Sequence, residues 1–354
     1  MARAIRLAER GLGETNPNPV VGCVIVKSGK VVGEAYHRRA GGPHAEVTAL
    51  ARAGPRARGA TLYVNLEPCA HHGRTPPCAP LLAQAGLRRV VAALRDPDPR
   101  VDGRGLAVLR RAGIEVSTGV LEAEAAALNE RFIVAARAGR PYVTLKAALT
   151  LDGRLAAARG ESKWITSPAQ RREARRLRRL HDAVAVGIGT VLADDPMLLP
   201  TPRVRRAFPR VVFDSRLRIP LESRLVRSAR RSPVWVLGTR GNAGKRIRLE
   251  RQGVTVIQQA SGGPHVSLPW AVRELWRRGL RSLMVEGGSR LLGAFLAARL
   301  VDAVALYRAP LLLGGRDGLP AFGGPTPVRL ADALALRSRA ERPLFELWYP
   351  VASR

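Results

Sequence analysis

Short apolar runs alternate with segments of helical spacing along the whole chain. In the first part, β-branched runs predict strands over residues 20–26, 31–36, 60–66, 88–94 and 114–116. Apolar residues at helical spacing predict helices over residues 1–10, 44–50, 78–85, 106–112 and 121–137. The turn at Ser28-Gly29 joins the first two strands as a hairpin. This alternation is typical of one complete α/β layer structure.

A second set of elements follows Gly139-Arg140-Pro141, where a proline just past a helix and a glycine marks a stop. Strands are expected over residues 142–149, 183–187, 210–213, 234–237, 254–257, 282–285, 303–307 and 344–349. Helices such as 168–180 and 268–278 separate them. Such β-branched runs are typical of a mainly parallel sheet that is covered on both faces. We therefore predict two α/β domains, residues 1–140 and 141–354.

Composition supports a globular protein of the cytoplasm. The chain is 46% hydrophobic and 25% charged, which excludes a disordered polymer. Three cysteines are too few for a secreted disulfide scaffold, and no apolar run reaches the ~20 residues that span a bilayer. The N-terminal segment is expected to be an amphipathic helix and not a signal peptide. We expect a cytoplasmic protein without a membrane partner.

The net charge of +31 raises the question of a polyanionic partner such as nucleic acid. Residues 146–354 carry most of the excess, with 38 basic and 16 acidic side chains. In the run 171–179, Arg171, Arg175 and Arg178 share one stripe of the expected helix, which could face a phosphate pocket. The neighbouring stripe of Arg172, Arg176 and Arg179 could then face water. Aromatic residues are 5% of the chain and none interrupts this run, so the stacking platform of a single-strand binder is missing. A basic nucleic-acid-binding or RNA-editing protein is the alternative hypothesis.

The strongest chemical signal is a metal-binding pattern. His44-Ala45-Glu46 is followed by Pro68-Cys69 and then by Cys78, the order of the zinc deaminase signature. One histidine and two thiolates give zinc three ligands and leave the fourth position for water, whose pKa zinc lowers to supply hydroxide. Glu46 is placed to move that water's proton to the substrate ring and to departing ammonia. His71 and His72 are competing ligands, whereas Cys23, within an apolar strand, is expected to be a core residue.

The second half shows features that hold anions and no obvious nucleophile. Glu286-Gly287-Gly288 ends a strand and enters a helix, where backbone N–H groups can hold a phosphate. Gly187-Ile188-Gly189-Thr190 is a similar exit from a strand, here into a loop. Neither is the G-x-G-x-x-G dinucleotide fingerprint, so each alone is weak evidence.

Several further motifs mark the two halves of the chain. Cys69 and Cys78 are separated by eight residues, unlike the C-x-x-C of other zinc deaminases. The motifs of the first half are residues 16–23, 42–46, 66–69 and 73–78, and those of the second half are residues 146–154, 160–166, 187–196, 214–215 and 286–288. Together they resemble the bifunctional riboflavin-biosynthesis deaminase/reductase family, and the longer loop between the cysteines is specific to that family.

This resemblance implies a fold and two reactions. The fold is an N-terminal cytidine-deaminase-like αβα layer domain followed by a dihydrofolate-reductase-like α/β domain. The first domain would use zinc to hydrolyse the ring amino group of 2,5-diamino-6-ribosylamino-4(3H)-pyrimidinone 5′-phosphate. The second would use NADPH to reduce the ribosyl group to ribityl, giving 5-amino-6-ribitylaminouracil 5′-phosphate. The partner is then a small phosphorylated pyrimidine and no nucleic acid; the oligomeric state stays open, with a homo-oligomer among the options.

The resemblance also implies site residues by position. Glu46 would be catalytic, and the zinc ligands would be His44, Cys69 and Cys78. Contacts with NADPH are implied for Ala148, Trp164, Thr190, Asp194, Ser215, Gly288, Ser289, Arg290, Leu291, Leu292, Gly293 and Ala294. Substrate contacts are implied for Ser162, Arg178, Leu198, Arg203 and Glu286. The family usually continues its Asp-Asp-Pro loop with Leu-Thr-x-Arg, whereas this chain reads Leu-Leu-Pro-Thr-Pro-Arg over residues 198–203, which puts the role of Arg203 in doubt.

Overall fold

The computed structural model describes residues 1–73, 75–161, 165–239, 242–260, 263–325, 327, 329–339 and 346–350. The chain divides into two compact units, Met1–Gly139 and Arg140–Arg354, each with a main sheet of its own. Within the described residues, none of the helices has the length and apolar character needed to cross a bilayer.

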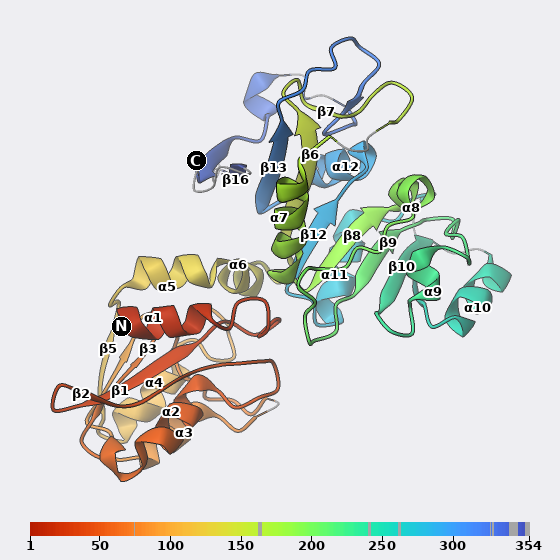
Figure 1. The fold of residues 1–354 in the computed structure, drawn as a ribbon. Coiled ribbons are helices and arrows are strands. Elements are labelled where there is room, and N and C mark those ends of the chain that lie inside the picture. The colour runs from red at the N-terminus through yellow and green to blue at the C-terminus, as the bar shows by residue number, and fades with distance from the viewer. Residues whose placement is uncertain are drawn as a thin grey trace. The chain divides into compact units, whose positions relative to one another are not determined.

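The N-terminal unit is built on a five-stranded sheet with the order β2-β1-β3-β4-β5 (Figure 1). β1 (Gly22–Lys27) and β2 (Lys30–Tyr36) form the expected hairpin, and β3 (Thr61–Val64) runs antiparallel to β1. β4 (Arg89–Ala92) and β5 (Glu115–Thr118) continue the sheet in parallel with β3. The elements thus follow the alternation of the sequence.

Helices cover both faces of this sheet. α2 (Ala45–Ala53), α3 (Cys78–Gln84) and α4 (Arg104–Arg111) share one apolar core with the strands, and the short helix η1 (Gly54–Ala57) follows α2. α1 (Ala2–Glu9), α5 (Glu122–Leu128) and α6 (Glu130–Ala138) share the core on the other face. Cys23 is fully buried in the first of these cores, as expected. The αβα layers predicted for this half are confirmed.

The single helix expected over residues 121–137 is wrong, because the chain breaks it at Asn129. The buried Asn129 side chain bonds both backbone groups of one residue. Its Oδ1 accepts from the N–H of Val20 at 2.9 Å, and its Nδ2 donates to the Val20 carbonyl at 3.0 Å. This pair of bonds fixes the chain just before β1, and Asn129 itself leaves the helical conformation, with φ −103° and ψ 17°.

The C-terminal unit contains a nine-stranded sheet with the order β11-β10-β9-β8-β12-β6-β13-β16-β15. Its parallel strands are β6 (Tyr142–Thr150), β8 (Ala183–Gly187), β9 (Arg210–Phe213), β10 (Val234–Thr239), β11 (Thr255–Gln259), β12 (Ser282–Glu286) and β13 (Ala303–Ala309). Two antiparallel strands complete one edge, β15 (Leu336–Arg339) and β16 (Glu346–Pro350). β7 (Arg154–Ala156) and β14 (Leu319–Pro320) pair separately, and a short helix, η2 (Leu330–Asp332), precedes β15. The mainly parallel sheet is confirmed.

Alternate residues of the strands enter different cores, which explains their continuous apolar character. One core is shared with α11 (Leu268–Arg277) and α12 (Ser289–Ala297). The opposite face packs against α7 (Pro168–Arg179), α8 (Ile188–Asp194), α9 (Arg224–Arg227) and α10 (Ala243–Arg251). The sequence predicted α7 and α11, whereas the segment of α8 was expected to be a loop. This α/β unit matches the fold class that the sequence implied.

Candidate active sites

Three side chains from separate elements meet in the N-terminal unit. His44 stands directly before α2, Cys69 follows β3 in a loop, and Cys78 is the first residue of α3. Nδ1 of His44 lies 3.6 Å from Sγ of Cys69 and 3.2 Å from Sγ of Cys78, and the three ligand atoms all lie within 4.8 Å of one another. The N–H of Cys78 also donates to Sγ of Cys69 at 3.3 Å, which ties the start of α3 to the loop.

These donors fit a tetrahedral zinc ion. Zn–S bonds of about 2.3 Å and Zn–N bonds of about 2.1 Å place neighbouring donors roughly 3.5 to 3.8 Å apart, close to the observed separations. Hydrogen bonds from Cys78 and His44 lower the pKa of the Cys69 thiol to about 4, whereas the bond to Cys69 and burial raise the pKa of Cys78. A divalent cation between the sulfurs favours the thiolate form of both. His71 and His72, the competing candidates, are not in this group of ligand atoms.

Glu46 lies in the first turn of α2, two residues beyond His44. Its side chain is 3% exposed, and Oε2 has no hydrogen-bond partner among the described residues. Burial raises the pKa of Glu46, while the neighbouring His44 acts in the opposite direction. A buried carboxyl whose oxygen lacks a partner is suited to exchange protons with a molecule bound beside it.

Thr75 is a site residue that the sequence did not reveal. Its Oγ1 lies 3.1 Å from Nε2 of His44, on the side of the ring opposite to the two sulfurs. A partner on the outer nitrogen orients a metal-binding imidazole and fixes its tautomer. No spacing rule marks such a residue, because any hydroxyl or carbonyl of a neighbouring loop can serve.

Glu67 organises the loop that carries Cys69. Its buried carboxylate accepts hydrogen bonds of 2.9 to 3.2 Å from four backbone N–H groups, those of Asp96, Gly103, Gly105 and Leu106. A Cβ atom on Gly105 would lie 1.9 Å from the carbonyl oxygen of Pro68, so the start of α4 packs directly on the residue before Cys69. This scaffold was also missed, since the sequence gives no sign of four donors converging on one side chain.

Asp96 belongs to the same scaffold and is largely buried. Its Oδ1 accepts from the N–H of Asp98 at 2.9 Å, and Asp98 itself pairs with Arg100 at 2.5 Å. Burial raises the pKa of Asp96 to about 7. Residues 96–99, which have the sequence Asp-Pro-Asp-Pro, therefore form a structured turn beside Glu67.

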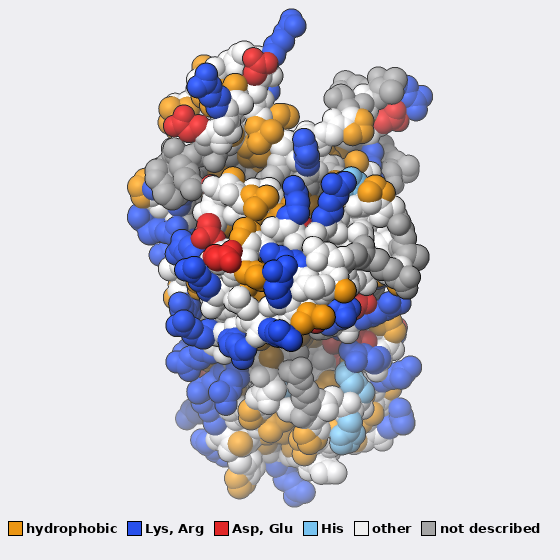
Figure 2. Space-filling model, turned by 90° about the vertical axis from the view of Figure 1, so that its right-hand side faces the viewer, with side chains coloured by type: hydrophobic (Ala, Val, Ile, Leu, Met, Phe, Trp, Pro, Cys, Tyr) orange, Lys and Arg blue, Asp and Glu red, His pale blue; other side chains and the backbone are white. Residues whose placement is uncertain are grey.

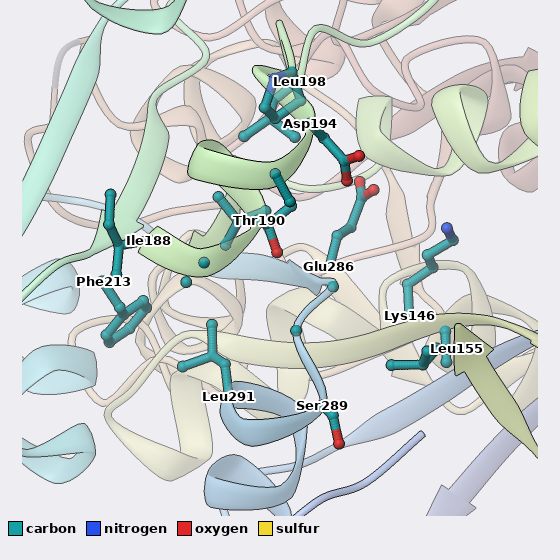
Figure 3. Close-up of a pocket in the computed structure, with 18 of the residues that line it drawn as sticks. Lys146, Leu155, Ile188, Thr190, Asp194, Leu198, Phe213, Glu286, Ser289 and Leu291 are labelled. Carbon is teal, nitrogen blue, oxygen red and sulfur yellow. The ribbon is translucent and has the colours of Figure 1, made fainter. Parts of the chain in front are cut away.

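A cavity of about 1620 Å³ opens in the C-terminal unit at the carboxyl ends of β6, β8, β9 and β12. Ligands of open α/β sheets bind at this end of the strands. α7, α8 and the start of α12 supply further lining residues. Figure 3 shows Lys146, Thr190, Glu286 and Leu291 around this space.

Three charged side chains form a network in the cavity. Arg178 donates from Nε and Nη2 to the two carboxylate oxygens of Glu286, at 2.5 and 2.9 Å. Glu286 is paired in register with Lys146 on the adjacent strand, so both side chains lie on the same face of the sheet. Burial lowers the pKa of Lys146 while Glu286 opposes the shift, and Arg178 holds the pKa of Glu286 below its ordinary value against the effect of burial. Sequence reasoning assigned no role to Lys146.

The glycine turn takes a backbone conformation that side chains disfavour. Gly287 and Gly288 have φ angles of 73° and 74°, and a Cβ atom on Gly287 would lie 3.2 Å from Oγ1 of Thr190. The turn leads into the N-terminus of α12. This end of the helix, with its free backbone N–H groups, lies at the cavity. This arrangement suits a phosphate group.

Most residues predicted for the reductase site line this one cavity. They are Ala148, Arg178, Thr190, Asp194, Leu198, Ser215, Glu286, Gly288, Ser289, Arg290, Leu291 and Ala294. Arg203, Leu292 and Gly293 do not line it: Arg203 is exposed, and Leu292 is fully buried in the core. Gly293 packs on the backbone, since a Cβ atom there would lie 1.5 Å from the Gly323 carbonyl oxygen. Ser162 and Trp164 lie outside the described residues.

Two family models match the chain, one in each half. Residues 1–94 match the cytidine and deoxycytidylate deaminase zinc-binding region, and residues 141–340 match the RibD C-terminal domain. The riboflavin biosynthesis protein RibD of Escherichia coli is 45% identical, with 94% of this chain and 92% of that protein covered. The protein of the same name from Aquifex aeolicus is 44% identical, with 89% of this chain and 87% of that protein covered.

Solved structures agree over nearly the full length. One form of Acinetobacter baumannii RibD has a TM-score of 0.88 and 39% identity, covering 100% of this chain and 98% of its own. The diaminohydroxyphosphoribosylaminopyrimidine deaminase/5-amino-6-(5-phosphoribosylamino)uracil reductase of Thermotoga maritima has a TM-score of 0.83 and 37% identity, covering 99% and 97%. Together with the three side chains that fit zinc and the cavity of the C-terminal unit, these matches show that the chain belongs to the RibD family of bifunctional deaminase/reductases of riboflavin biosynthesis.

Proposed function

We propose that the two activities divide at the boundary that the sequence suggested. Residues 1–140 deaminate 2,5-diamino-6-ribosylamino-4(3H)-pyrimidinone 5′-phosphate, and residues 141–354 reduce the ribosyl group of the product to ribityl. A zinc-dependent deaminase and an NADPH-dependent reductase are the two enzymes of this family. The alternative hypothesis of a nucleic-acid-binding or RNA-editing protein finds no support in the relatives.

The strong positive charge has another explanation. Lys and Arg side chains outnumber acidic ones on the face shown in Figure 2, and the net charge of the whole chain is +31. The proposed substrate and NADPH both carry phosphate groups, so part of the excess serves small anionic ligands. We assign the remainder to solvated surface.

In the deaminase site, the protein's task is to hold the metal and to move protons. Zinc bound by His44, Cys69 and Cys78 would act as a Lewis acid that makes water nucleophilic at neutral pH. We assign Oε2 of Glu46 to carry two protons in turn. It accepts the first proton of the attacking water and passes it to the pyrimidine ring, and it then moves the second proton of that water from the new C–OH group to the departing ammonia. Burial excludes competing water from this carboxyl.

In the reductase site, the protein positions two anionic ligands and supplies a proton. Bound NADPH provides the hydride. We assign the turn at Gly287-Gly288 and the start of α12 to hold cofactor phosphate, and the end of the cavity beside Arg178 and Leu198 to hold the sugar phosphate. Lys146 can release a proton from Nζ to the sugar as it is reduced, because its pKa is lowered by burial.

The meeting of His44, Cys69 and Cys78 beside the buried Glu46 is the observation that carries the proposal. Its test is to incubate the zinc-loaded protein with the diamino substrate, with and without NADPH. We expect ammonia release without NADPH, and NADPH oxidation only after deamination. Oxidation of NADPH before any ammonia appears would contradict this order.

A single substitution tests the proton transfer. Glu46→Gln keeps the shape of the side chain but cannot carry the proton, so we expect zinc content to be retained and ammonia release to fall by roughly 100-fold or more. Retained zinc controls for folding of the N-terminal unit, and reduction of added deaminated product by the C-terminal unit should be unaffected. Full ammonia release by this variant would remove Glu46 from the role.

A further inference from the structure

The arginines of α7 divide into a stripe toward the cavity and a stripe toward water. Arg171, Arg175 and Arg178 line the cavity and are half-buried. Arg172 and Arg176 are exposed and do not line it. The helix is oriented by Ala174 and Leu177, which pack against strand residues of the sheet. The stripe that the sequence suggested for a phosphate pocket therefore faces the cavity.

The charge of Arg178 is already neutralised within the protein. Besides its two bonds to the carboxylate of Glu286, its Nη1 donates to the carbonyl of Leu199 at 2.9 Å. Three of its five N–H directions are thus occupied, and a full negative charge stands against it. A phosphate dianion beside this pair needs a further cation to balance its charge.

Arg203, which the sequence assigned to the substrate, does not supply that cation in this structure. The loop before it lines the cavity through residues 197–199 and 201, but Arg203 itself is exposed and outside the lining. The same loop is tied to α7, since the N–H of Thr201 donates to the carbonyl of Arg175 at 3.2 Å. The cavity wall nearest this loop therefore carries Arg175.

Arg175 has the properties that a phosphate site requires. It lies three residues before Arg178 on the same face of the helix, and no acidic side chain of the described residues forms an ion pair with it. A guanidinium matches the geometry of a phosphate with two parallel hydrogen bonds. Its charge is thus uncompensated and available at the end of the cavity formed by α7 and residues 197–201.

We propose that Arg175 binds the 5′-phosphate of the sugar substrate in the reductase cavity, taking the place expected of Arg203. The inference rests on the proposed function, because it requires a phosphorylated sugar at this end of the cavity. The turn at Gly287-Gly288 and Ser215 mark the part assigned to NADPH, so the contact concerns the substrate and leaves cofactor binding unchanged.

The test compares substrates with and without the phosphate in the full-length, zinc-loaded enzyme. For Arg175→Gln, we expect the reductase KM for the phosphorylated, deaminated substrate to rise roughly 10- to 100-fold. The KM for the dephosphorylated analogue and the KM for NADPH stay at the wild-type values. Ammonia release is unchanged, and the unchanged KM for NADPH shows that the C-terminal unit, which carries Arg175, is folded.

Matched variants make the outcome decisive. Arg172→Gln removes the same charge from the exposed side of the same helix and should leave all three KM values unchanged. Arg175→Lys retains the charge without the paired geometry, and an intermediate KM for the phosphorylated substrate supports a direct contact. If Arg175→Gln fails to fold, Arg175→Lys carries the same comparison.

Three results would overturn the proposal. An equal loss with both substrates indicates a structural role, a rise in the KM for NADPH places Arg175 at the cofactor, and a larger loss in Arg203→Gln returns the role to Arg203. Failure of the proposed function itself looks different, since the wild-type enzyme would then not reduce the phosphorylated substrate at all.

Discussion

Oγ1 of Thr75 lies 3.1 Å from Nε2 of His44, and the other ring nitrogen, Nδ1, faces both cysteine sulfurs. A metal-binding nitrogen must present its lone pair, so the hydrogen of a neutral imidazole has to be on Nε2. There it donates to the threonine hydroxyl. The threonine hydroxyl can accept this hydrogen, so the contact holds the ring in the orientation that a zinc site of one histidine and two cysteines needs.

Removing this hydroxyl should weaken zinc binding. We expect Thr75→Val to lower zinc affinity by about 10- to 100-fold, the usual cost of losing a partner of a metal-binding histidine. Thr75→Ser keeps the hydroxyl and should stay near wild type. Competition with a chelator of known affinity measures the difference, and equal zinc affinity in Thr75→Val would show that the ring is oriented by other contacts.

Loss of the Glu67 carboxylate should lower the stability of the N-terminal unit strongly. Glu67→Gln replaces an acceptor of four backbone N–H groups by an amide whose own N–H₂ opposes them, so we expect a loss of about 3 kcal/mol around α4. Hydrogen exchange of peptides covering 96–109 measures the local free energy of opening. Glu34→Gln, in a partly exposed ion pair with Arg3, should change protection little. Unchanged exchange in Glu67→Gln would contradict the scaffold.

The sequence was sufficient for the zinc ligands and insufficient for what orients them. His44, Cys69 and Cys78 could be predicted because zinc chemistry admits few residue types and the order of the motif is specific. Thr75 and Glu67 act through ordinary hydrogen bonds, and their partners are up to 39 residues away in the chain. Such contacts depend on loop conformations that no local pattern encodes.

The reductase half shows a similar limit. Regular strands such as 183–187 were predicted to the residue because buried apolar runs mark them clearly. The segment of α8 was missed because its two glycines suggested a loop, although Ile188 and Val191 anchor it to the core. A helical wheel gave the stripe of Arg171, Arg175 and Arg178, but only the fold places it in the cavity and leaves Arg203 outside.

The turn at Gly288 should tolerate no side chain. Its φ of 74° makes Gly288→Ala strained, and the added Cβ would stand 3.5 Å from Oγ1 of Thr190, in the space assigned to cofactor phosphate. We expect the KM for NADPH to rise by roughly tenfold or more, since about 1 to 3 kcal/mol of strain has to be absorbed. Ammonia release should not change.

Gly244→Ala is the matched control for this variant. Gly244 lies in α10, has no positive φ, and would place its Cβ in open space. Alanine there favours the helix and should leave both activities unaltered. An unchanged KM for NADPH in Gly288→Ala would place the cofactor away from this turn.

Because of Lys146, the reductase kcat should fall at alkaline pH, giving its pH profile an alkaline limb that the deaminase profile lacks. Three groups face it, Glu286 on β12, Arg178 on α7 and the ring of Tyr307 on β13, and burial lowers its pKa below the ordinary 10.5. Lysine is protonated below its folded pKa and neutral above it. As the pH rises through that lowered value, the proton that Lys146 donates is lost and the reductase kcat falls. The pH profile of NADPH oxidation, measured on the deaminated substrate, checks this.

Two substitutions separate the proton of Lys146 from its charge. Lys146→Met should lower the reductase kcat by roughly 100-fold or more and remove the alkaline limb, while Lys245→Met, on α10 and outside the cavity lining, should do neither. Lys146→Arg keeps a cation that does not deprotonate in this range, so activity should stay low if proton donation is required. High activity of Lys146→Arg with a flat alkaline profile would show that the site needs only the positive charge.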